Sequence, residues 1–175
     1  MSTSSYLSAV NQKLLFASKL IKLISNSEGV TKDRHLSIAM AQSITAQLCQ
    51  AWAWHLRDVA TNYKVKDVEV INSVDDLVAS LSADGKQPAE STELKQLFYS
   101  STSWVNAMFT AHSQLPSLPV IRKAEMDVDR LPMLSLDDAF DAKKRVVEWD
   151  LLTVINWSKQ TNELVERHRD MMIEF

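Results

Sequence analysis

Histidine is the residue type in this sequence best suited to bind a metal or to transfer a proton near neutral pH. A helical bundle can gather histidines into a metal site when they share a Glu-x-x-His or His-x-x-x-His spacing, and neither spacing occurs here. The sequence has four histidines, and three of them fall near expected helix ends, where capping or helix-dipole roles are common. The sequence therefore predicts no metal site and no cofactor. The histidines are His35, His55, His112 and His168, and all but His55 fall near helix ends.

His55 and Asp58 form the pair whose spacing fits acid–base catalysis, because residues three apart lie one turn apart on a helix. In so apolar a stretch, a buried and mutually satisfied polar pair is the commoner arrangement. The two glycines, Gly29 and Gly85, exclude both a glycine-rich phosphate loop and a Gly-x-Ser-x-Gly nucleophile turn. We therefore predict no catalytic residue.

A group of six acids is a second place where a cation could bind. An EF-hand loop needs a central glycine and a glutamate at its twelfth position, and neither is present. We interpret these acids as a solvated loop and the first turn of the next helix. They are Glu125, Asp127, Asp129, Asp137, Asp138 and Asp141.

Two short basic clusters, Lys143-Lys144-Arg145 and Arg167-His168-Arg169, have the composition of a phosphate-binding site. Acids flank both clusters, and basic residues in a last helical turn complement the helix dipole without any ligand. The whole chain carries a formal net charge of −3, so it has no basic field for nucleic acid. We expect no nucleic-acid binding.

Composition predicts the elements that hold these residues in place. The 175 residues suffice for one domain, and they include only two glycines and four prolines. Hairpins and strand–helix turns use glycine because they need positive φ angles, so this scarcity predicts an all-α protein. The N-terminus does not resemble a secretory signal, and we expect a cytoplasmic protein.

The most apolar stretch, Leu36 to Ala60, is expected to form the central helix. Arg57 and Asp58 are its only fully charged residues, and apolar side chains cover nearly all of its sides. Its glutamines and hydroxyl residues argue against a membrane span, so neighbouring helices should bury it. Cys49, the single cysteine, is expected inside as a small hydrophobe.

Caps, glycines and prolines divide residues 1–175 into a single domain, an up-and-down bundle of four long helices plus one short helix. The long helices are expected from the Ser2–Ser5 caps to Asn26, from the Thr31 cap to Asn62, from Pro88 to residue 115, and from the Ser135 cap to Phe175; the short helix follows the Ser73 cap.

Two connecting segments and the length of the last helix need separate predictions. Residues 64–72 alternate weakly, and we favour a packed loop over a short strand because no partner strand is apparent. Residues 116–135 are expected to be an extended connector. The last helix would span about 37 residues, roughly 55 Å, so a bend near residues 156–162 or a protruding end is expected.

Aromatic and C-terminal apolar residues suggest a contact surface. Trp52 and Trp54 point about 200° apart on a helix, so one of them should lie at the edge of the bundle. The end of the chain, with Met172 and Phe175, offers apolar surface to a partner. The candidate pocket or partner contacts are Trp54, His55, Asp58, Trp157, His168, Met172 and Phe175.

Two segments are similar to an uncharacterised family of small proteobacterial proteins of about 170 residues, a domain of unknown function. They are Asn11-Gln12-Lys13-Leu14-Leu15, and Trp157 followed by Glu166-Arg167-His168-Arg169. The resemblance implies a bacterial cytoplasmic protein and transfers no catalytic residue.

These observations predict a non-catalytic helical bundle that acts through protein–protein contacts, with another protein or as a homodimer. The alternative is a small-molecule or metal-binding bundle, with or without enzymatic activity, whose pocket would lie between the central and last helices. His55, Asp58 and tryptophan side chains would line that pocket. A nucleic-acid accessory role is the third hypothesis, and salt-dependent binding would support it.

Overall fold

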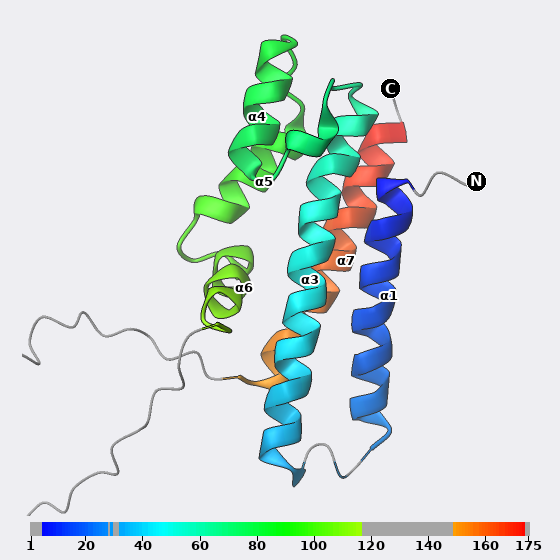
Figure 1. The fold of residues 1–175 in the computed structure, drawn as a ribbon, viewed down its shortest axis with the longest axis vertical. Coiled ribbons are helices and arrows are strands. Elements are labelled where there is room, and N and C mark those ends of the chain that lie inside the picture. Colours follow the sequence, from blue (N-terminus) through cyan, green and yellow to red (C-terminus); the bar gives the residue numbers. More distant parts are fainter. Residues whose placement is uncertain (1–4, 28, 30–31, 117–148, 174–175) are drawn as a thin grey trace, which may run out of the picture.

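The computed structural model describes residues 5–27, 29, 32–116 and 149–173. These residues form six α-helices and one 3-10 turn, with no strand among them, which confirms the predicted all-α class. The three longest helices lie side by side along the long axis, and the three short helices follow one another beside α3 (Figure 1). The elements are α1 (Tyr6–Ser25), α3 (Arg34–Asn62), η1 (Val68–Val70), α4 (Val74–Ala83), α5 (Ala89–Tyr99), α6 (Trp104–Ser113) and α7 (Leu151–Ile173).

The central helix is α3, as predicted, and it packs against α1, α4, α6 and α7. Its buried residues, among them Ile44 and Leu48, occupy about half of its circumference, the half that faces these neighbours. Ala39, Ser43 and Gln50 on the opposite half are exposed, so the expectation that neighbours bury this helix on nearly all sides was only partly correct. Cys49 is buried as well, and burial raises the pKa of its thiol to about 12. The cysteine is therefore the inert core residue that the sequence predicted.

The predicted long helix after Pro88 is two helices, α5 and α6. Pro88 does precede the first turn of α5, but the helix ends at Ser100–Ser103. Ser103 caps α6 by accepting a hydrogen bond from the backbone N–H of Asn106 at 3.0 Å, and the Asn106 amide donates to the Phe98 carbonyl at 3.1 Å. The four residues of the break all carry hydroxyls, which compete with helical backbone hydrogen bonds.

The last helix is shorter than predicted. Residues 149–150 are not helical, and the Asp150 carboxylate caps α7 by accepting from the backbone N–H of Thr153 at 2.9 Å. The 23 residues of α7 extend roughly 35 Å and are helical throughout, including residues 156–162. The bend or protruding end was expected for a helix of about 55 Å, and α7 is shorter than that. The expected connector (apart from residue 116), the Ser135 cap, the six acids and the 143–145 cluster lie outside the described residues.

The other helix starts follow from side chains that bind free backbone N–H groups. Ser5 caps α1 and Ser73 caps α4, as the sequence predicted. Asp76 completes a capping box with Ser73. Asp33 caps α3 by accepting from the backbone N–H groups of His35 and Leu36. The predicted cap, Thr31, lies outside the described residues.

Residues 64–72 form the packed loop that we favoured over a strand. Two of its own side chains, Val65 and Ile71, are buried, and η1 lies within it. The Arg57 guanidinium ties the loop to α3 by donating to the Ile71 carbonyl at 2.8 Å and to the Asn72 amide oxygen at 2.9 Å.

Candidate functional site

Two of the predicted site residues, His55 and His168, lie against each other between α3 and α7. Both side chains are fully buried, and Nε2 of His55 is 2.9 Å from Nδ1 of His168. Their rings stack with centroids 5.2 Å apart and planes 24° apart. The helix-end role expected for His168 is therefore wrong, because its ring contacts the side chain of His55 and does not cap the end of α7.

Glu93 on α5 completes this contact and was not predicted. One of its carboxylate oxygens is 3.0 Å from Nε2 of His168, and the other accepts a hydrogen bond from the Arg167 guanidinium. Glu93 lies about 100° from Leu94, off the apolar stripe of α5, so this pattern did not mark it. Glu90, four residues before Leu94, does lie on that stripe. An acid on an apolar stripe indicates a buried polar partner.

The hydrogen-bond chain has a direction set by its acidic end. With Glu93 ionised, His168 donates from Nε2 to the carboxylate, so its Nδ1 can only accept. His55 must then donate from Nε2 to His168, which leaves Nδ1 of His55 as an acceptor. That atom is buried and has no hydrogen-bond partner among the described residues.

Both histidines resist protonation. Burial, followed by the positive charges of a protonated His168 and of Arg169, lowers the pKa of His55 to about 3. Burial also lowers the pKa of His168, while Glu93 and Glu90 partly offset that effect. The pair is therefore neutral at pH 7, and a single added proton belongs on His168, beside the Glu93 carboxylate.

Asp58, predicted to pair with His55, takes a different partner on α7. Its carboxylate lies 4.0 Å from Nε of Arg169, and Nη1 of Arg169 donates to the Asn11 side chain of α1 at 2.8 Å. Burial raises the pKa of Asp58, and the Arg169 charge opposes that effect. The His55–Asp58 pairing was wrong because α7 presents adjacent partners, His168 and Arg169, to the two residues.

The remaining candidate residues do not join this cluster. Trp54 is the half-buried tryptophan expected at the bundle edge, with its ring centroid 5.7 Å from that of Tyr6. Trp157 lies in the core, and Met172 is partly buried against a second group of core residues. Phe175 lies outside the described residues.

A pocket of about 570 Å³ lies where α3 ends, α5 begins and α7 passes. This volume is in the usual range for small-molecule sites. His55, Asp58 and the tryptophans do not line it, so it is not the pocket expected for the alternative function. Its walls are Tyr63, Lys86, Gln87, Pro88, Ala89, Glu90 and Met171.

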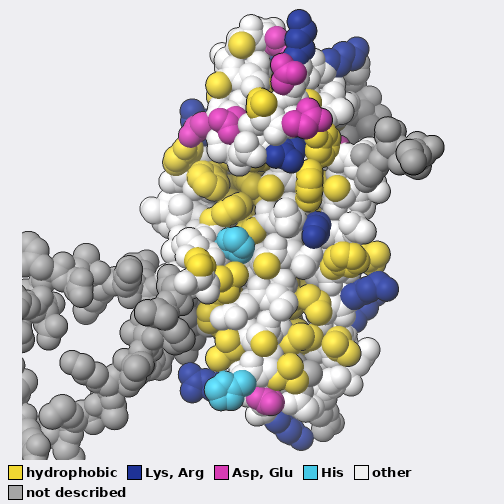
Figure 2. Space-filling model, viewed as in Figure 1, with side chains coloured by type: hydrophobic (Ala, Val, Ile, Leu, Met, Phe, Trp, Pro, Cys, Tyr) yellow, Lys and Arg dark blue, Asp and Glu magenta, His cyan; other side chains and the backbone are white. Residues whose placement is uncertain are grey.

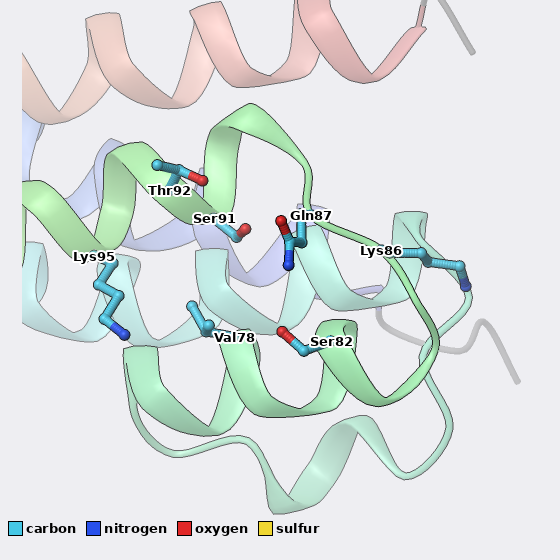
Figure 3. A pocket seen from close by; sticks show the side chains of 7 residues that line it. All are labelled: Val78, Ser82, Lys86, Gln87, Ser91, Thr92 and Lys95. Carbon is cyan, nitrogen blue, oxygen red and sulfur yellow. The ribbon is translucent and has the colours of Figure 1, made fainter.

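A second, smaller pocket of about 130 Å³ lies between α4 and α5. Ser82, Gln87 and Ser91 point towards the space between the two helices, and Lys86 points away from it (Figure 3). This volume is too small for a typical cofactor. Lys86 and Gln87 border both pockets, so the loop before α5 separates them.

No family model matches the chain, and no curated protein or solved structure matches it either. Within the described ranges, no three histidine, cysteine or acidic side chains converge as a metal site would require. None of the described helices combines the length and apolar character needed to cross a membrane.

Proposed function

We propose that this chain is a non-catalytic binding module that contacts another protein through the outer side of α1. The observation that carries the proposal is the exposure of large apolar side chains there. Leu15 is 51% exposed, Phe16 40% and Leu23 54%. Single exposed leucines are ordinary, but several on one side of one helix make an apolar surface of the kind found at interfaces.

Helical geometry supports a single surface. Val10, Leu14 and Ala17 are buried on the inner side of α1, which packs chiefly on α3. At about 100° per residue, Leu15 and Leu23 fall opposite those buried residues. The same outer side carries Lys19 and Lys22 beside the leucines. We call these residues, with Phe16, the outer face of α1: Leu15, Phe16, Lys19, Lys22 and Leu23.

The charge of this helix points to an acidic partner. The sequence of α1 contains three lysines and neither aspartate nor glutamate, although the whole chain has a formal net charge of −3. Along the side that α1 occupies, Figure 2 shows hydrophobic and basic side chains next to one another. A partner helix with acids beside an apolar stripe would complement the outer face. A two-fold homodimer would instead bring lysines towards lysines.

Affinity capture from native cells with the unaltered chain and two variants tests this proposal. Leu15→Ser/Leu23→Ser should abolish recovery of a stoichiometric acidic protein, because it removes the apolar part of the outer face. Leu152→Ser is the matched control, since Leu152 is 76% exposed on α7. Equal recovery with the α1 variant, or a monomer that recovers no partner, would contradict the proposal. Recovery of a second copy alone would leave only the homodimer.

A further inference from the structure

The larger pocket has an unusual residue in its wall, the buried acid Glu90. Glu90 is 2% exposed, and it is the only buried Asp, Glu, Lys or Arg within the described ranges. Burying a carboxylate without a cation is unfavourable unless hydrogen bonds replace the lost water. A group retained at such a cost is a candidate for function.

The partners of Glu90 do not neutralise its charge. The Tyr63 hydroxyl donates to it, with its oxygen 3.1 Å from both carboxylate oxygens. One hydroxyl proton fills a small part of the acceptor capacity of a carboxylate. Burial raises the pKa of Tyr63 to about 12, together with the smaller effects of the Glu90 charge and hydrogen bond. No ion pair joins Glu90 to a lysine or arginine of the described residues, and its place in the first turn of α5 adds only the helix dipole.

The other walls of the pocket are largely apolar. Met171, Pro88 and Ala89 line it, and the Tyr63 ring stands beside Glu90. Lys86 is the one basic residue among the described residues that line the pocket. Its ammonium group donates to the Tyr63 carbonyl at 2.7 Å and lies 3.4 Å from the Asp84 carboxylate. Its charge is therefore held by groups other than Glu90.

We propose that this pocket binds a small organic cation, with an ammonium group at Glu90 and Tyr63 and an apolar body against Met171 and Pro88. The ammonium donates to the carboxylate acceptors that Tyr63 leaves free, and it supplies the missing positive charge. The apolar body gains by leaving water. None of the lining residues belongs to α1, so the site does not depend on the protein contact proposed for that helix.

Three ligands of one chain length test the charge preference: hexylamine as the cation, hexanol as the neutral form and hexanoate as the anion. Amide chemical shifts of the full chain are followed at neutral pH as each ligand is added. Hexylammonium should move the amides of Tyr63, Ala89, Glu90 and Met171, and it should bind about tenfold or more tightly than hexanol. Hexanoate should bind most weakly of the three.

Glu90→Gln should remove this preference and leave hexylammonium and hexanol equal, because it deletes the charge and keeps the shape. Folding should survive, since replacing a buried charge by a neutral group lowers the desolvation cost. Glu163→Gln is the matched control: it removes one negative charge from an exposed position on α7 and should retain the preference. Equal binding of hexylammonium and hexanol to the unaltered chain, equal effects of the two variants, or no shifts at the pocket would overturn the proposal.

Discussion

Lowering the pH from about 8 to about 5 is expected to destabilise the fold by at least about 2 kcal/mol, because His55 and His168 cannot take up two protons where they lie. Both rings are fully buried and are joined by a hydrogen bond of 2.9 Å between their nitrogens. The pKa of His55 falls to about 3, and that of His168 is also lowered. Unfolding therefore becomes coupled to proton uptake as the pH falls.

The magnitude follows from linkage. A histidine whose pKa is lower in the folded chain binds fewer protons there, so its contribution to stability is complete above pH 6.5 and falls as the pH drops below it. A pH of 5 is about 1.5 units below the pKa of the unfolded histidine, which is therefore protonated, while His55 is still neutral in the folded chain. At about 1.36 kcal/mol per unit, His55 alone accounts for about 2 kcal/mol. Any proton deficit of His168 adds to this value.

Denaturant unfolding at the two pH values, followed by tryptophan fluorescence, measures the difference. His55→Gln should show a smaller loss, because its amide can still donate to His168 but cannot take a proton. His35→Gln/His112→Gln is the control and should keep the full loss, since neither side chain is buried. Equal stability at the two pH values, or the same loss in the His55 variant as in the unaltered chain, would refute the reasoning.

Three further predictions concern stability and reactivity. Ser73→Ala should cost about 1 kcal/mol in thermal or denaturant unfolding, because it removes the capping box at the start of α4. Leu48→Ala should cost about 2–5 kcal/mol in the same assay, since Leu48 is fully buried in α3 and the variant leaves a cavity. Cys49 should react with a thiol reagent only as fast as the fold opens, because burial holds its pKa near 12; rapid reaction at neutral pH in the folded chain would contradict this burial.

Features determined by nearby residues were predictable from the sequence. The Ser73 cap and the central position of α3 depend on side chains within a turn or on the helix itself. The break at Ser100–Ser103 was missed because the apolar spacing from Leu94 to Phe109 continues across it. The four consecutive hydroxyl residues were the signal that should have outweighed the periodicity.

The candidate site was less predictable because it depends on how three helices align. Both His55 and His168 were named in advance, but their contact requires the register between α3 and α7, which periodicity does not define. Glu93 enters from α5, a third helix, and was missed. Glu90 was detectable as an acid on an apolar stripe, whereas its place in a pocket wall follows only from the packing of Tyr63 and Met171 beside it.

Photo-crosslinking in native cells tests the central claim, that the outer face of α1 binds an acidic protein. A photoreactive amino acid is placed at Leu23 on that face or, as the control, at Leu152 on α7; both side chains are more than half exposed. The account predicts an adduct with an acidic protein from position 23 and none from position 152. An adduct from position 152 alone, no adduct from position 23, or an adduct there with a second copy of this chain would contradict the account.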